Sequence, residues 1–133
     1  MSAYCVTISP DDRVAKTEYN GLKSIQEAVG GYIECIATRM FKVNNCYYSV
    51  VFYCDEEYRM KNMDKYCKVN AVASLLSGTQ VYGNVVVMPV EGDDDTNGYD
   101  EEQCKAVMGY LSNLINAAKV MVGEYHKHYD CIL

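Results

Sequence analysis

The segment of the sequence that is best suited to bind an anion is YRMKNMDKYCK, residues 58–68. It is rich in basic and aromatic side chains, and Asp64 is its one acid. The basic and aromatic residues are Tyr58, Arg59, Lys61, Lys65, Tyr66 and Lys68. Ammonium and guanidinium groups bind phosphate oxygens, and a tyrosine ring can stack on a base. The segment therefore predicts a site for a small anionic nucleotide. The alternative is a solvated surface loop that leads into a helix.

Two further polar residues are candidates for contact with a ligand. Gln26 lies one turn after Leu22, on or near the apolar face of a predicted helix, and Glu34 lies inside an apolar strand. Buried polar groups in proteins have hydrogen-bond partners. Either a ligand supplies these partners, or Gln26 bonds nearby backbone carbonyls and Glu34 faces water.

The acidic triplet Asp55, Glu56 and Glu57 has the residue types needed for acid–base chemistry with paired carboxylates. Its place directly after a predicted strand is also typical of a solvated turn. The only histidines, His126 and His128, lie near the C-terminal end, and no serine or cysteine has an identifiable histidine partner. Because nucleophilic catalysis needs such a base within reach, the sequence predicts a protein that is not an enzyme.

Metal-binding residue types occur in two places. One is a group near the C-terminus: His126, His128, Asp130 and Cys131. Residues two apart on a helix point to different faces, so no metal site is predicted there. The loop DDDTNG, residues 93–98, fills positions one, three, five and six of an EF-hand loop, but Cys104 stands at position twelve, where a bidentate glutamate is needed. Weak calcium binding and a flexible acidic linker are both open for this loop, and no cofactor is predicted.

Gly30 and Gly31 separate a predicted helix from a predicted strand. Asn20 can cap the start of this helix, and its apolar residues lie three and four apart. They are Leu22, Ile25 and Val29. Gly30 follows at the position where a left-handed C-cap residue is common. Phosphate is bound by the amide N–H groups of a helix N-terminus, whereas a C-terminus presents carbonyls. The glycines therefore predict a structural turn and not a phosphate site.

The preceding and following segments alternate between strand and turn patterns. Alternating or β-branched residues predict strands at 4–8, 13–19, 32–41, 46–54 and 81–89. Turn residues occupy 9–12 and 42–45, and residues 69–76 predict a short helix. Strands joined by such short turns pair antiparallel. The predicted fold class is α+β, with a small and mainly antiparallel sheet covered by two short helices and one long C-terminal helix.

The long helix is predicted at residues 100–128, after an acidic loop at 91–99. Its apolar residues recur at offsets of three, four and seven: Cys104, Val107, Met108, Leu111, Leu114, Ile115, Ala118, Val122 and Tyr125. The opposite face carries small or apolar residues: Gly109, Ala117, Val120 and Gly123, with Met121 close by. Short strands cannot cover a stripe of this length. We therefore expect a single domain, residues 1–133, with residues 4–90 as its core, that forms a homodimer through this helix.

Charge and composition exclude several classes of partner. The net charge of −6 disfavours bulk nucleic acid, which needs a basic face. No apolar run approaches the roughly 20 residues of a membrane-spanning helix. No secretion signal is visible, and the seven cysteines form no Cys-x-x-Cys pair. A cytoplasmic protein with reduced thiols is expected, in which Cys35, Cys54 and Cys104 behave as small hydrophobic residues.

Four stretches together resemble a small domain family of unknown function that is carried by phages, bacterial mobile elements and some large DNA viruses. They are TEYNGLKSIQEAVGGYIEC, FYCDEEYRMKN, VNAVASLL and VYGNVVVMP, within residues 4–90. Gln26 and Glu34 match polar positions of the family pattern. Tyr58 departs from it, because a turn glycine is usual there, and the long C-terminal helix is not part of it. The resemblance implies an accessory or counter-defence role and supplies no reaction.

The function expected is therefore that of a non-enzymatic binding protein of a virus or mobile element, which acts on a host factor through a protein interface. The alternative is a protein that sequesters a small anionic nucleotide with residues 58–68. In both cases the host cell cytoplasm is the expected location, and no membrane partner is expected.

Overall fold

The computed structural model describes residues 3–57, 69–90 and 98–129, with side chains as far as Ala117 in the last range. Over these residues the chain forms an antiparallel sheet of five strands in the order β2-β1-β5-β4-β3. The strands are β1 Tyr4–Ile8, β2 Val14–Glu18, β3 Ile33–Val43, β4 Cys46–Asp55 and β5 Val85–Pro89. The predicted fold class and antiparallel sheet are confirmed.

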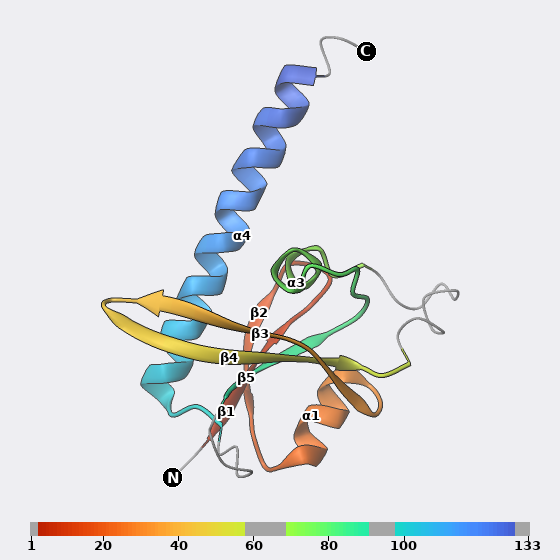
Figure 1. The fold of residues 1–133 in the computed structure, drawn as a ribbon, viewed down its shortest axis with the longest axis vertical. Helices are drawn as coiled ribbons and strands as arrows, with labels where there is room; N and C mark the ends of the chain where they lie inside the picture. The colour runs from red at the N-terminus through yellow and green to blue at the C-terminus, as the bar shows by residue number, and fades with distance from the viewer. Residues whose placement is uncertain (1–2, 58–68, 91–97, 130–133) are drawn as a thin grey trace.

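Helices cover both faces of this sheet (Figure 1). They are α1 Leu22–Val29, α3 Ala71–Ser77 and α4 Glu101–Tyr129. Successive side chains of a strand point to opposite faces. In β5, accordingly, Val86 and Met88 pack with α1, while Val85 and Val87 pack in the larger core under α3 and α4. Because β5 is covered on both faces, its sequence is continuously apolar rather than alternating.

The end of α1 is formed as the sequence predicts, but its beginning is not. Gly30 has φ 88° and is a left-handed C-cap, and its N–H donates to the Gln26 carbonyl at 2.9 Å. The predicted Asn20 cap is wrong, because the N-cap position is occupied by Gly21, which has no side chain to accept a hydrogen bond there. Instead, the Ser24 hydroxyl accepts a hydrogen bond from the Asn20 N–H at 2.8 Å. Leu22 was expected on the buried face and is exposed, because the first residue of the helix lies beyond the edge of this small core.

Two strand boundaries differ from the predicted ones by two residues or more. β3 continues to Val43, because Asn44 and Asn45 alone make the turn, with φ values of 49° and 67°. Positive φ at both residues is the geometry of a two-residue hairpin turn. β5 begins at Val85 rather than at residue 81, because Gly83 at φ 77° turns the chain before the strand starts.

The first half of α4 packs on the sheet, and two side-chain to backbone hydrogen bonds cap its N-terminal end. The Asp100 carboxylate accepts from the Gln103 N–H at 2.8 Å, and the Gln103 side chain accepts from the Asp100 N–H at 3.0 Å. This reciprocal capping box satisfies two N–H groups at the helix start. The predicted stripe is buried at Cys104, Val107, Leu111 and Ile115. The 29 residues of α4 correspond to a length of about 43 Å, and Figure 1 shows the helix continuing beyond the sheet.

Candidate functional site

The predicted nucleotide site lies outside the described residues. This applies to all six of its residues: Tyr58, Arg59, Lys61, Lys65, Tyr66 and Lys68. The same is true of residues 93–97 of the acidic loop. The other two predicted contact residues are described, and the structure does not bring them together. Gln26 lies on α1, while Glu34 is exposed on β3 opposite Cys54, whose side chain belongs to the core on the other face of the sheet.

The turn at Gly30 and Gly31, which we call the glycine corner, packs closely against the turn at residues 55–57, which we call the acidic turn. A Cβ atom placed on Gly31 would lie 2.9 Å from Oδ1 of Asp55, so only glycine lets the two segments approach this closely. The same carboxylate oxygen accepts from the Glu57 N–H at 2.9 Å, and the Glu56 N–H donates to the Tyr32 carbonyl at 2.7 Å. Asp55 is buried, whereas Glu56 and Glu57 are exposed. The triplet is thus a solvated turn with a buried anchor.

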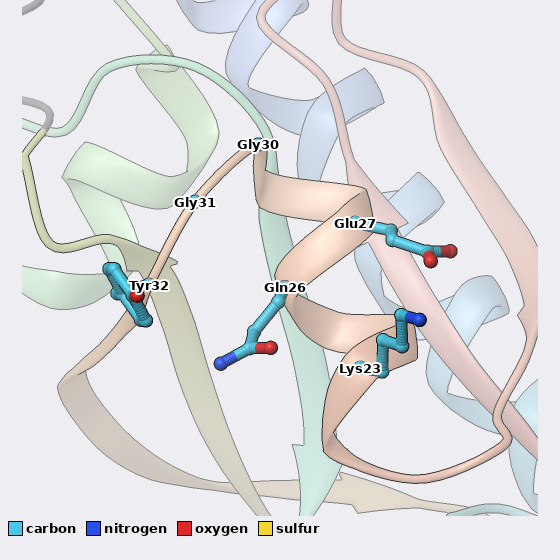
Figure 2. A pocket seen from close by; sticks show the side chains of 6 residues that line it. All are labelled: Lys23, Gln26, Glu27, Gly30, Gly31 and Tyr32. Carbon is cyan, nitrogen blue, oxygen red and sulfur yellow. The ribbon is translucent and has the colours of Figure 1, made fainter.

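Beside this corner lies an open depression of about 390 Å³. Its lining residues are Lys23, Gln26, Glu27, Gly30, Gly31 and Tyr32. Figure 2 shows the Gln26 side chain pointing from α1 toward Tyr32, while Lys23 and Glu27 project from the other side of the helix. The Gln26 side-chain amide has no hydrogen bond to any described residue. The corner is instead closed by its backbone carbonyl, which accepts from both Gly30 and Gly31.

Other polar residues of the four stretches hold the fold together. Asn70 is fully buried, and its amide donates to the carbonyls of Ile8 and Gly83, each at 2.9 Å. Its side-chain oxygen accepts from the Ala73 N–H at 3.1 Å and so caps α3. Asn84 donates to a carbonyl in the last turn of α1, at 3.2 Å. The asparagines therefore link β1, α1, α3 and the turn before β5.

The outer half of the β3–β4 hairpin forms an arm, which we define as residues 38–49. β4 pairs with β5 only over Val50–Tyr53, so the arm extends beyond the central strands (Figure 1). One face of the arm packs on α4, where the rings of Phe41 and Tyr110 stack with centroids 4.2 Å apart. Sequence patterns alone do not identify this arm, because its exposure depends on the length of the neighbouring strand β5.

The other face of the arm is exposed, and we call it the open face. Its residues are Met40, Lys42, Tyr47, Ser49 and Val90. Met40 on β3 lies opposite Ser49 on β4. The Val90 N–H donates to the Ser49 carbonyl at 2.9 Å, so Met40, Ser49 and Val90 form a row across the sheet. The exposed fractions of Met40, Tyr47 and Val90 are 62%, 64% and 44%. Large apolar side chains thus lie side by side on the protein surface.

Basic groups lie on the arm, and Lys42 is the one on the open face. The Lys42 ammonium lies 5.7 Å from the centroid of the Tyr47 ring. Lys42 also lines a depression of about 610 Å³ between the arm and α4, together with Lys105 and Glu102. The arm itself contains Arg39 and Lys42 and no acid, although the whole chain has a net charge of −6. This end of the sheet is therefore locally basic.

The cysteines of the described residues are free thiols. Burial raises the pKa of the Cys5 thiol to about 11, and burial also raises the pKa of Cys104. Both thiols are therefore protonated at neutral pH and are poor nucleophiles. Cys54 and Cys104 are buried as predicted. Cys35 is exposed, contrary to expectation, because a β-bulge between Cys35 and Ala37 interrupts the alternation of an edge strand.

The described residues also bear on metal ions and on membranes. Across residues 3–57, 69–90 and 98–117, there is no group of three or more histidine, cysteine or acidic side chains placed to hold a metal ion. In the part of the chain that the structure describes, no helix combines the length and the apolar character needed to span a bilayer.

Comparison with known proteins identifies one family. Its model, described as Domain of unknown function (DUF3846), matches residues 1–112. The match confirms the predicted resemblance to a domain family of unknown function. It also extends past residue 90 into the first turns of α4, so the expectation that the C-terminal helix lies outside the family pattern is wrong for residues 101–112. Searches of curated proteins and of solved structures gave no match.

Proposed function

We infer that this chain, which belongs to the family Domain of unknown function (DUF3846), is a non-enzymatic accessory binding protein that acts on a host protein. In this proposal it belongs to a virus or mobile element and works in the host cytoplasm. Its interface with the host protein is formed by surface side chains rather than by a catalytic cleft.

The observation that supports this proposal is the open face of the arm. Met40, Tyr47 and Val90 are exposed side by side, and methionine and tyrosine are enriched in protein interfaces. Exposed apolar patches on small domains commonly mark interaction sites. By contrast, Asn70, Asn84 and Asp55, which belong to the stretches that carry the family resemblance, make hydrogen bonds within the fold. Their polar groups serve folding, which favours a binding role for the exposed arm.

The proposal is tested by affinity capture from host extract with the tagged chain, followed by native mass spectrometry of the retained complex. Wild type is expected to retain a host protein in stoichiometric amount, and Tyr47→Ser is expected to lose it. Tyr32→Ser is the matched control, because Tyr32 is also an exposed tyrosine, at 71%, but lies at the glycine corner. Equal retention by both variants would contradict an interface on the open face. Failure of wild type to retain any host protein would contradict the function itself.

We also propose that the protein is a homodimer through α4. Support comes from the described part of its outer face, where Gly109 and Ala117 are exposed and a Cβ atom on Gly109 would meet no atom within 4 Å. Small residues let a second backbone approach closely. The prediction also uses Val120, Met121 and Gly123, which lie in the part of α4 where the structure describes the backbone alone.

A further inference from the structure

Among the strands that the structure describes, none uses the backbone groups on the outer edge of β3. β3 is the last strand in the sheet order. The two-residue turn makes Val43 and Cys46 a hydrogen-bonded pair, and such pairs alternate along an antiparallel ladder. The N–H and C=O groups of Thr38, Met40 and Lys42 therefore point away from β4. The contact of Val90 with the Ser49 carbonyl agrees with this alternation, since Ser49 opposes Met40 and directs its own groups toward β5.

One end of this edge is blocked within the fold. The Arg39 guanidinium donates to the Thr38 carbonyl at 2.7 Å. It also donates to the carbonyls of Leu76 and Ser77 in the last turn of α3, at 2.8 Å and 3.2 Å. Arg39 thus fastens the end of α3 beside Thr38 and covers that carbonyl. The accessible edge starts at Met40 and includes Lys42.

The side chains of these two residues lie on the open face. A strand added beside β3 would continue the row of Met40, Ser49 and Val90. Its side chains on that face would contact Met40 and Lys42, while Tyr47 lies one strand further away, on β4 opposite Lys42. Backbone hydrogen bonds would provide affinity, and the apolar contacts would select the side chains of the added strand.

Charge determines which kind of segment fits. Arg39 and Lys42 are the charged residues of the arm, and the depression next to Lys42 is lined by both Lys105 and Glu102. Two copies of β3 paired edge to edge would bring these cations together, and lysine at a strand edge is a common protection against such pairing. An acidic segment would instead be attracted.

We propose that the β3 edge at Met40 and Lys42 binds an extended segment of another protein, with an apolar and an acidic residue two positions apart on one face, as an additional antiparallel or parallel strand. This inference rests on the proposed function and identifies the chemistry of the partner. The apolar residue of the segment contacts Met40, and its carboxylate lies beside Lys42 on the same face.

The probe is a phage-displayed library of random dodecapeptides, selected on the full chain, with the enriched peptide then synthesised and labelled. Met40→Pro removes the outward N–H, and proline is tolerated on an edge strand where that N–H faces solvent. Met40→Ala is the matched control, because it shortens the same side chain and keeps the N–H. Peptide affinity measured by fluorescence polarisation should fall about tenfold further for Met40→Pro than for Met40→Ala, as expected for a lost backbone hydrogen bond. Lys42→Glu should weaken binding of the acidic peptide, and added salt should do the same.

If Met40→Pro unfolds, amide hydrogen exchange of the wild-type protein still tests whether the peptide binds at the β3 edge. On peptide binding, amide hydrogen exchange at Met40 and Lys42 should slow, while exchange at Phe41, whose N–H faces β4, should not change. Failure to enrich any peptide, enrichment of basic peptides, or unchanged exchange at Met40 and Lys42 would each overturn the proposal. A host protein that binds wild type and both Met40→Pro and Lys42→Glu equally would also overturn it, while leaving the proposed function intact.

Discussion

Gly31→Ala tests the contact between the glycine corner and the acidic turn. Gly31 has no positive φ, so alanine is compatible with its backbone conformation. The added Cβ would lie 2.9 Å from Oδ1 of Asp55 and 3.2 Å from its Cγ. Because Asp55 is the last residue of β4 and is buried, its carboxylate cannot simply turn into solvent. The substitution should therefore break the hydrogen bond from the Glu57 N–H.

The expected cost follows from two opposing contributions. Loss of a hydrogen bond to a charged group costs about 1.5–3 kcal/mol. Replacing glycine by alanine returns about 0.4–1 kcal/mol, because the unfolded chain has less conformational freedom. The free energy of unfolding should therefore fall by about 1–2 kcal/mol. For a chain of 133 residues, this lowers the melting temperature by about 4–7 °C.

A double-mutant cycle with Asp55→Ala separates this clash from other causes. In the Asp55→Ala background the Cβ has no carboxylate to meet, so Gly31→Ala should be neutral or slightly stabilising. Gly30→Val is the control for backbone conformation, because Gly30 has φ 88° and open space around it. Its cost should exceed about 1 kcal/mol and should not depend on Asp55. Wild-type melting of Gly31→Ala, or an equal cost in both backgrounds, would refute the argument.

Four further predictions use other parts of the molecule. Asn70→Ala leaves the buried Ile8 carbonyl and the half-buried Gly83 carbonyl without their donor and should destabilise by about 2–5 kcal/mol, measured by urea unfolding. Alkylation of buried Cys5 should be far slower than that of exposed Cys46 at pH 8, and its rate should rise only toward pH 11, because the raised pKa of Cys5 keeps this thiol protonated at lower pH. The measurement is mass spectrometry of iodoacetamide-treated protein, and faster modification of Cys5 than of Cys46 would contradict the prediction. Light scattering should show a dimer that Val120→Glu dissociates without loss of helix content, and a wild type that stays monomeric at high concentration would exclude the dimer. If residues 58–68 bind a nucleotide, calorimetry should detect it and Arg59→Ala should weaken it, whereas a screen of mono-, di- and cyclic nucleotides without binding would exclude this site.

Local patterns were sufficient to predict most elements of the fold. Alternation and β-branching located the strands, and the spacing of Cys104, Val107 and Leu111 located the buried face of α4. Gly30 could be assigned because a helix C-cap depends only on neighbouring residues. These features have in common that their cause lies within a few positions of the chain.

Features that depend on distant contacts could not be predicted in this way. The Gly31 backbone and the Asp55 side chain are 24 positions apart, and no pattern near either residue indicates their contact. Exposure of Met40 and Tyr47 likewise depends on β5 ending before it reaches them. The exposed edge of β3 was missed because a strand sequence does not reveal whether it has one neighbour or two.

The strand order has a consequence for the order of events during synthesis. β1–β2 and β3–β4 are each local hairpins, and each can form as soon as its own residues are available. β5 lies between them and pairs with both β1 and β4, so the sheet is complete only after Pro89 has left the ribosome. Until then, the inner edges of β1 and β4 are both unpaired and apolar, and such edges promote aggregation. A nascent chain stalled before Val85 would therefore leave both of these inner edges exposed.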